Sequence, residues 1–333
     1  MAVIPSGSVY IGSYEEEIGR KKGERERILA TIDKPFAMAT TEVTLGQYRV
    51  FVEETQYKSK EAFYKGEPLV GCNFYDGKSY GYVAEHNWKN PGYPQRETDP
   101  VVCVSWSDAD AYAQWLSKKT GREYRVPSTV EFEYASRAGS SSPWYWGTNP
   151  ADACQYANVG DQTFQNKYPK RAAFPCDDGY VYTTRVGRFK PNAFGLYDMV
   201  GNAWEWTNDC FQMNLDEAPV DGSSREENPD EACQWRTPKG GSWISGIAWS
   251  RAAVRSRDGA DYRSFMLGFR VAAQVEKMEN KWPNLIFNKD LNKKNSMKIS
   301  RRKFVRNVAG ASAAIGTIGV AGCAGKEKNQ EVA

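Results

Sequence analysis

The sequence predicts an α+β domain of low regular structure, in which few helices pack on short strands joined by long ordered loops. Helical periodicity with capping signals is confined to three segments between Thr44 and Gly139. From Ser140 to Ala273 the chain is rich in Gly, Asn, Asp, Trp and Tyr and has no long helical period. Hydrophobic residues make up 41% of the 333 residues and aromatic residues 13%, which is enough for one large core. We therefore expect one domain over residues 1–275.

The first elements are two strands and a helix. Residues 3–13, VIPSGSVYIGS, predict a strand that enters a turn, and residues 36–44 predict a second strand. Thr44 then opens a helix of about three turns, because its hydroxyl and Gln47 three residues later form a capping box.

Two further helices and several short strands follow. Residues 100–104 predict a buried strand, and the next helix is expected to be capped by Ser107 and ended by Gly121. A third helix is expected after Ser128, with Glu131 completing a capping box and Gly139 as its end. Short strands are then predicted at residues 184–189, 240–243, 251–256 and 268–273.

Charge and histidine content exclude two classes of function. The net charge is +3, and residues 277–306 carry ten Lys or Arg against two acids, so the domain itself is mildly acidic. This balance excludes a nucleic-acid footprint across the domain. The single histidine, His86, rules out a multi-histidine iron or zinc site and is interpreted as a loop side chain.

Six cysteines lie in the domain and a seventh, Cys323, lies in the tail. None forms a CxxC motif, so the pattern favours disulfides made in an oxidising compartment, each contributing roughly 3 kcal/mol. Successive pairing would join Cys72 to Cys103, Cys154 to Cys176 and Cys210 to Cys233. The other fourteen connectivities stay open, as does the alternative of six free thiols in a cytoplasmic protein.

Eight ordered blocks resemble the formylglycine-generating enzyme family, also called the sulfatase-modifying factor family. They include TEVTLGQYRVFV, ANVGD, NAFGLYDMVGNAWEWTND, KGGSW and LGFRVA, and they run from Val3 to Ala273. The resemblance implies a compact variant of the C-type lectin fold. Founding members of the family oxidise a sulfatase cysteine to formylglycine with copper, two cysteines and oxygen. Relatives include iron enzymes and binding proteins, so the resemblance specifies the fold better than the activity.

The resemblance also points to a changed catalytic centre. The positions that match the family's copper-binding cysteines are Ser245 and Ser250. Serine hydroxyls do not replace thiolates as ligands of a soft cuprous ion, so copper and oxidase chemistry are not expected. Trp204 and Ser242 match the residues that line the oxygen pocket; the favoured alternative is that Trp204 is a core residue and Ser242 caps backbone.

Calcium is the ligand that the resemblance supports with specific donors. One implied site consists of Asn158, Val159, Asp178 and Tyr180, and a second of Asp198, Gly201, Ala203 and Glu205. Mixed carboxylate, amide and carbonyl oxygens suit this hard cation. The alternative is that Asp178 and Glu205 merely cap turns.

The C-terminal segments have a different character. Residues 276–296 are a basic spacer that we expect to be disordered, and residues 326–333 are a polar tail. Residues 297–325 resemble a twin-arginine signal with a lipoprotein cleavage box, with Arg301, Arg302 and Cys323 as its key residues. Such signals belong at an N-terminus, so we interpret this segment as the start of an adjacent reading frame. The run is too short and too rich in Ala and Gly for a membrane anchor.

These observations lead to one leading function and two alternatives. The leading hypothesis is a non-oxidase family member, located in the periplasm or at the cell surface and stabilised by calcium. It would bind a peptide, protein or glycan, with a sulfatase as one candidate partner, and would reach a membrane only through a lipid anchor. The alternatives are a formylglycine-generating oxidoreductase and a structural surface lipoprotein. A cytoplasmic location is the alternative that follows from the missing N-terminal leader.

Overall fold

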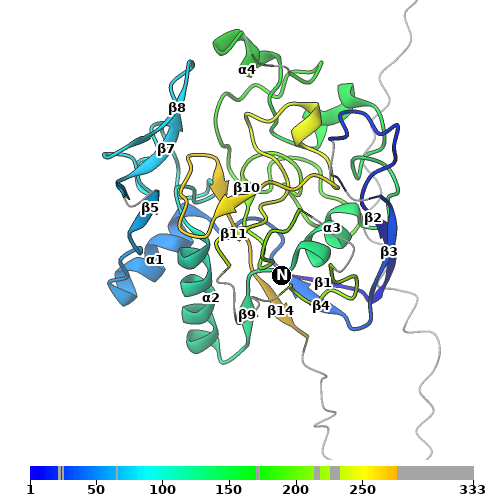
Figure 1. Ribbon diagram of the computed structural model, residues 1–333, viewed down its shortest axis with the longest axis horizontal. Helices are drawn as coiled ribbons and strands as arrows, with labels where there is room; N and C mark the ends of the chain where they lie inside the picture. Colours follow the sequence, from blue (N-terminus) through cyan, green and yellow to red (C-terminus); the bar gives the residue numbers. More distant parts are fainter. Residues whose placement is uncertain are drawn as a thin grey trace, which may run out of the picture. The chain divides into compact units, whose positions relative to one another are not determined.

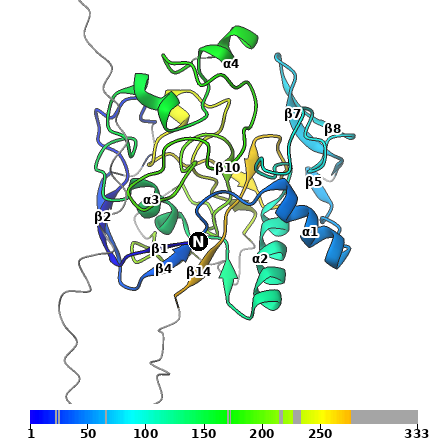
Figure 2. The same ribbon diagram turned by 180° about the vertical axis from the view of Figure 1, so that it is seen from behind.

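The computed structural model describes residues 1–21, 24, 26–64, 67–169, 171, 173–213, 218–225 and 233–275 (Figures 1 and 2). These residues belong to one compact unit, Met1–Lys277. None of the helices in the described part of the chain has the length and apolar character that a membrane span requires. The three C-terminal segments, with Arg301, Arg302 and Cys323, lie outside the described residues.

Two of the predicted helices begin at their predicted caps. Helix α1 (Leu45–Thr55) follows Thr44, whose hydroxyl accepts the Gln47 amide while the Gln47 side chain accepts the Thr44 amide, so the capping box is confirmed. Helix α3 (Thr129–Arg137) follows Ser128 with Glu131 in the same role. The remaining helical segments are α4 (Gln162–Lys167) and the 3₁₀ turns η1 (Pro150–Gln155) and η2 (Ile247–Trp249).

The predicted cap of the second helix is wrong by two residues. Helix α2 (Trp106–Thr120) is capped by Ser105, which forms a reciprocal box with Asp108, and it ends at Gly121 as expected. Ser107 lies inside the first turn, where its hydroxyl donates to Asp261. Ser105 and Ser107 flank Trp106, and the sequence alone does not show which of them caps the helix. The structure shows that Ser107 instead contacts Asp261.

The strands are short: β1 (Ala2–Ile4), β2 (Gly7–Ile11), β3 (Ile28–Ile32), β4 (Phe36–Met38), β5 (Ala62–Tyr64), β6 (Glu67–Leu69), β7 (Cys72–Tyr75), β8 (Tyr80–Val83), β9 (Tyr124–Arg125), β10 (Trp204–Glu205), β11 (Trp235–Arg236), β12 (Asp258–Gly259), β13 (Leu267–Gly268) and β14 (Ala272–Gln274). The largest sheet has the order β1-β4-β14-β9, and all its pairs are antiparallel. Strand β14, the last strand of the described domain, lies inside this sheet and pairs with β4 on one side and β9 on the other. Among the pairs of named strands, only β10 and β13 run parallel.

Four predicted strands are wrong, and two more are right only in part. No named strand lies in residues 100–104, 184–189, 240–243 or 251–256. Of residues 36–44 only β4 is a strand, and residues 268–273 contain only the end of β13 and the start of β14. Residues 101–104 are buried as expected, but the Val101 amide donates to Val43 and the Cys103 amide to Ser264. Because partners change from one residue to the next, the backbone is satisfied without a ladder.

The hydrophobic core surrounds irregular loops rather than a single large sheet. Helices α1 and α2 contribute to one cluster, in which Tyr48, Phe51 and Tyr112 pack with Trp206 and Phe269. Helix α3 and strands β1 to β4 form a second cluster on the other side. Both views show α1 and α2 on the side opposite the β2–β3 hairpin, with loops of the second half between them (Figures 1 and 2).

The three disulfides are confirmed with the successive pairing. Cys72–Cys103, Cys154–Cys176 and Cys210–Cys233 close separations of 31, 22 and 23 residues. The first bridge lies in a core cluster with Trp243 and Phe265. Each bridge restrains a loop that has little regular structure of its own.

A fully buried ion pair joins β10 to the segment between β13 and β14. The Arg270 guanidinium donates to both Glu205 carboxylate oxygens, at 2.6 and 2.7 Å, and neither side chain is exposed. The same guanidinium donates to the carbonyls of Ala39 and Tyr197. Arg270 thereby connects four separate segments of the chain.

We expect removal of one bridge to lower the free energy of unfolding measurably. Replacing Cys72 and Cys103 together with alanine should reduce it by roughly 3 kcal/mol, because the unfolded chain regains loop entropy. Urea denaturation measures the change. Thiol labelling of oxidatively folded, denatured protein should find none of the six domain cysteines free; six reactive thiols would contradict the pairing.

The Arg270→Met variant should lose about 3–5 kcal/mol of stability, because it leaves the Glu205 carboxylate buried and unpaired. The matched control is Arg49→Met, which breaks the exposed pair with Glu97 and should cost less than about 1 kcal/mol. Equal losses for the two variants in urea denaturation would show that the buried pair does not organise the fold.

Candidate functional site

A cavity of about 300 Å³ opens where β8, β10, β12 and β13 approach the loop that contains η2. Its walls combine four aromatic and three aliphatic side chains with three serines, one carboxyl and one arginine. The lining residues are Tyr80, Arg171, Trp204, Ile244, Ser245, Trp249, Ser256, Asp258, Tyr262, Ser264, Met266 and Leu267. The cavity contains two of the residues singled out from the sequence, Trp204 and Ser245.

Three serines lie together at the wall of this cavity. The Ser242 and Ser245 hydroxyl oxygens are 3.2 Å apart, and Ser245 Oγ also accepts the Ser242 amide at 3.0 Å. The Ser250 hydroxyl donates to the Ser245 carbonyl at 3.1 Å. All three residues are buried, but of the three only Ser245 lines the cavity. The structure thus brings Ser245 and Ser250 together and places Ser242 and Ser250 behind the wall.

An N-terminal segment supports the loop from outside. Arg251 is fully buried and pairs with Glu17, at 2.6 Å, and with Glu24. Lys21 Nζ lies 3.0 Å from the centroid of the Trp249 ring, and Trp249 packs edge to face with Trp204. The loop that holds Ser245 is therefore fixed by buried charge and aromatic contacts. Trp204 both lines the cavity and belongs to the core.

The residues of the first implied calcium set also lie together. Asp178 accepts the Val159 amide at 2.9 Å and the Tyr180 amide at 2.8 Å, a geometry that a turn cap would also have. Asn158 is fully buried, and its Oδ1 has no hydrogen-bond partner among the described residues. Burial and the neighbouring Asp161 carboxylate raise the pKa of Asp178 to about 8.

A potential ligand group of three residues occurs at the same place. Atoms of Cys154, Asp161 and Asp178 lie within 4.8 Å of one another. Because Cys154 is bonded to Cys176, its sulfur is not a thiolate, and the two carboxylates remain as donors.

The second implied set brings three buried carboxyl groups together beside one buried arginine. Asp198 and Glu205 are joined by Glu42, which is 1% exposed and was not singled out from the sequence. Burial, Asp198 and Glu205 together raise the pKa of Glu42 well above its ordinary value. Glu42 Oε2 and Asp198 Oδ1 are buried without a hydrogen-bond partner in the described part of the chain. Arg270 pairs directly with Glu205, and its single positive charge acts against the burial that raises the pKa of all three carboxyls.

Asn202 links the two sets. Its side chain donates to Glu42 Oε1 at 2.9 Å and accepts from Asn158 Nδ2 at 3.2 Å. The preceding Gly201 has φ +83°, and a Cβ there would lie 2.2 Å from the Asn158 carbonyl oxygen, so only glycine permits this approach. Unpaired buried carboxylate and amide oxygens on loops this close fit a hard cation such as calcium.

Glu42, Asp161 and Asn202 are the residues of this region that sequence reasoning missed. Each lies inside a block that had been recognised, TEVT, ANVGD and GNAW. Their polar side chains are visible in the sequence. Glu42 and Asn202 are 160 residues apart in the chain, however, so the sequence does not show that these two side chains meet. A search for every acid or amide within the recognised blocks would have included them.

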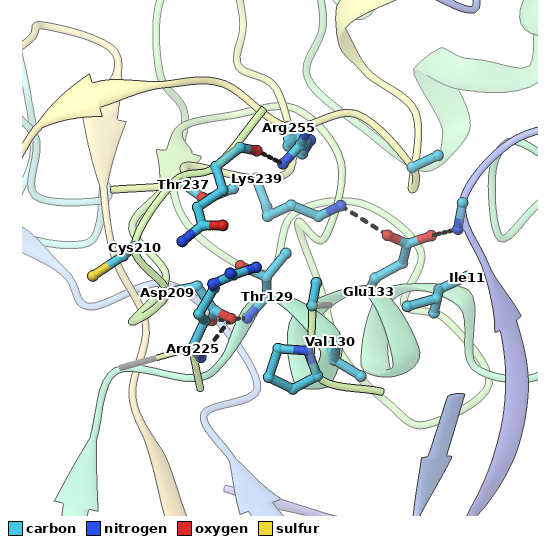
Figure 3. Close-up of a pocket in the computed structure, with 15 residues that line it drawn as sticks. Ile11, Thr129, Val130, Glu133, Asp209, Cys210, Arg225, Thr237, Lys239 and Arg255 are labelled. Carbon is cyan, nitrogen blue, oxygen red and sulfur yellow. Dashed lines mark hydrogen bonds and ion pairs between the residues drawn. The ribbon is translucent and has the colours of Figure 1, made fainter. Parts of the chain in front are cut away.

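A second, narrower cavity of about 60 Å³ lies beside α3 (Figure 3). Lys239 Nζ donates to Glu133 at 2.9 Å, and Asp209 accepts the Thr129 and Arg225 amides. Burial lowers the pKa of Lys239, against the opposing effect of Glu133. Figure 3 shows Lys239 and Glu133 pointing toward one another across the cavity. These charged groups satisfy one another, which indicates a structural role.

His86 lies in the turn after β8, where its ring packs against Phe74 with centroids 4.9 Å apart. Burial lowers the pKa of His86. It belongs to neither the serine cluster nor the acidic sets.

Comparisons with known proteins show the family to which this chain belongs. Residues 1–275 match the model of the sulfatase-modifying factor enzyme 1-like domain. The formylglycine-generating enzyme of Mus musculus is 31% identical over 300 residues, covering 82% of this chain and 74% of that protein. The inactive C-alpha-formylglycine-generating enzyme 2 of Bos taurus is 32% identical and covers 82% of this chain and 87% of its own length.

Solved structures of similar proteins have the same fold as this chain. PvdO from Pseudomonas aeruginosa superposes with a TM-score of 0.66 at 32% identity, covering 82% of this chain and 93% of that one. Variable protein 1 of Treponema denticola has a TM-score of 0.57 at 18% identity, covering 83% and 95%, and supports the fold alone. The predicted variant of the C-type lectin fold is confirmed. The chain belongs to the sulfatase-modifying factor family, which includes the formylglycine-generating enzymes.

Proposed function

We propose that this protein is a non-oxidase member of its family that binds a polypeptide in the cavity beside Ser245 and acts as a binding or maturation factor outside the cytoplasm. The observation that carries this proposal is the replacement of both thiol positions by Ser245 and Ser250 within an otherwise well-formed cavity. The cavity retains aromatic walls and a fixed loop, which are features of a binding site.

The hydroxyls argue against copper chemistry. A cuprous ion prefers soft thiolate ligands, whereas a serine hydroxyl stays protonated at neutral pH. The six domain cysteines are paired with one another in disulfides, so none is left to supply a thiolate. A relative named as an inactive formylglycine-generating enzyme provides a precedent for a member without this activity.

A polypeptide is the ligand that the family favours, since its name describes modification of sulfatases, which are proteins. A sulfatase or a similar exported protein is therefore the candidate partner, and a glycan is the alternative ligand. The disulfides support a location in an oxidising compartment such as the periplasm or the cell surface.

We further propose that calcium stabilises the loops around the cavity. Asn158 Oδ1 in the first set, and Glu42 Oε2 and Asp198 Oδ1 in the second, are buried oxygens without a partner among the described residues, and a cation bound at each set would satisfy them. Calcium accepts six to eight mixed oxygen ligands, while magnesium demands a stricter octahedron. Calcium would offset the repulsion between Glu42, Asp198 and Glu205.

The protein should form no aldehyde on a Cys-x-Pro-x-Arg peptide during aerobic incubation with Cu(I), as measured by mass spectrometry. A formylglycine-generating enzyme with both cysteines, treated in the same way, is the positive control. Turnover at ordinary enzyme rates would overturn the non-oxidase proposal. The Ser245→Cys and Ser250→Cys double variant should gain cuprous binding without aldehyde formation, because position 250 lies behind the cavity wall and its sulfur would not face a substrate. If calorimetry also finds that the Cys-x-Pro-x-Arg peptide does not bind, a purely structural protein is favoured.

Chelation should lower the melting temperature, and added calcium should restore it. Binding to the folded state alone stabilises by roughly 2.7 kcal/mol at one hundred times the dissociation constant. Glu42→Gln and Asp178→Asn should each remove part of the calcium response. The control is Asp209→Asn, whose carboxylate already accepts two backbone amides, and its calcium response should be unchanged. Unfolding that ignores chelator and calcium, with no metal in gently purified protein, would refute the calcium proposal.

A further inference from the structure

We propose that a third cavity, on the α1 side of the domain, binds a carboxylate that is joined to an apolar body. This cavity has a volume of about 450 Å³ and is lined by residues of α1, of the β5–β6 hairpin and of the turn that follows β8. Both views show α1, β5 and the β7–β8 hairpin on the same side of the domain (Figures 1 and 2). The cavity shares no lining residue with the one beside Ser245, so binding there is separate from the proposed function.

Aliphatic and aromatic side chains form much of the wall. Val52 and Leu69 line the cavity together with the rings of Tyr57 and Trp88. Trp88 packs edge to face on Tyr48, with ring centroids 5.3 Å apart, and Tyr48 is fully buried. The volume falls within the range of ligand pockets, roughly 300 to 1,000 Å³. Walls of this kind favour a ligand with an apolar body, because burying that body removes apolar surface from water.

A buried guanidinium lines the same cavity and has donors to spare. Arg263 is only 7% exposed. Its terminal nitrogens donate to the carbonyls of Lys60 and Asp261, which uses two of the five N–H groups of a guanidinium. Its acidic partner is Asp108, with Nε and Oδ2 3.4 Å apart, longer than the usual charge-assisted bond of about 2.7–2.9 Å. Arg263 therefore keeps hydrogen atoms for a further acceptor.

Asp108 is occupied by other donors. Its Oδ1 accepts the Tyr57 hydroxyl at 3.0 Å, and its Oδ2 accepts the Ser105 amide at 2.8 Å in the capping box of α2. The Tyr48 hydroxyl is a further donor, since it is buried without a hydrogen-bond partner in the described part of the chain. Burial and the Asp108 carboxylate raise the pKa of Tyr48, so this hydroxyl stays protonated. A ligand oxygen would satisfy it.

Positive charge also exceeds negative charge around the opening. Lys58 and Lys60 line the cavity, are exposed, and form no ion pair with a described acid. Glu61 is the one acid among the described lining residues. Burial lowers the pKa of His86, so its ring is neutral at neutral pH. Three cationic side chains, with Arg263 as the third, against one acid favour an anionic ligand.

A carboxylate matches these features. Its two oxygens suit a planar guanidinium, and the apolar walls suit the rest of the ligand. The same chemistry occurs at the C-terminus of a polypeptide that ends in an apolar residue and in a free apolar acid. These two sources are separated by the probes described next.

The test compares acids with their amides. The free probes are N-acetylleucine and N-acetylleucinamide, and the peptide probes are one short peptide ending in leucine, with either a free or an amidated C-terminus. Binding to the full chain is measured by calorimetry at neutral pH, where both acids are ionised. We expect an acid to bind roughly tenfold more tightly than its amide, because only the acid offers a charged acceptor. Acetate, which lacks the apolar body, should bind much more weakly than N-acetylleucine.

Substitution of exposed lysines locates the binding without disturbing the core. The Lys58→Gln and Lys60→Gln double variant should weaken binding of the acid several-fold and leave binding of the amide unchanged. The matched control is the Lys78→Gln and Lys118→Gln double variant, which changes the net charge equally at exposed residues that do not line the cavity. Its affinity for the acid should equal that of the wild type.

The Arg263→Gln variant should lose the preference for acids. Its melting curve is measured first, because the substitution leaves Asp108 buried without its arginine; if it does not fold, the lysine variants decide alone. Equal affinity of the wild type for acids and amides would overturn the carboxylate site. An acid preference that both the lysine variant and a folded Arg263→Gln retain would overturn it as well. Acetate binding as tightly as N-acetylleucine would refute the need for an apolar body.

The source of the carboxylate follows from which acid binds. Preference for the peptide acid alone identifies a polypeptide C-terminus, and preference for N-acetylleucine alone identifies a free apolar acid. Failure of every probe would overturn this site and leave the proposed function of the cavity beside Ser245 intact, because the two cavities share no lining residue.

Discussion

The buried pair of Glu205 and Arg270 is the contact on which the architecture of this domain depends. Both side chains are inaccessible to solvent, and the guanidinium also donates to two carbonyls from distant segments. It lies where the parallel strands β10 and β13 meet, next to Trp204 and Leu267, which line the cavity. A fold with so little regular structure cannot rely on ladders of backbone hydrogen bonds, so buried charge and disulfides define its loops.

In the proposed function, serines stand at the positions of the family's cysteines, and the cavity around them serves binding. Ser242, Ser245 and Ser250 hydrogen-bond to one another's atoms, which satisfies hydroxyls in a buried position without creating a nucleophile or a soft ligand. Around them the aromatic walls persist, supported by the Arg251 ion pairs and by Lys21 on Trp249. The reactive centre is therefore separable from the surface that would contact a substrate.

Buried charge in this protein falls into two kinds. Around Glu133 the opposing Lys239 and Arg137 lower the pKa of the carboxyl, although burial alone would raise it. Around Glu42 three carboxyls share one arginine, and two oxygens have no partner among the described residues. The first arrangement is complete in itself, and the second is the arrangement expected where a cation binds.

The sequence by itself determined the family, the fold class and two helix starts, because these depend on local signals. Thr44 with Gln47 and Ser128 with Glu131 form capping boxes over three residues. The cysteine pattern favoured disulfides, but only the structure decided among the fifteen connectivities. Only the tertiary structure decided which serine caps α2, why residues 101–104 form no strand, and that Glu42 approaches Asn202. Hydrogen-bond partners and desolvation are set by segments far apart in the chain, and no local pattern encodes them.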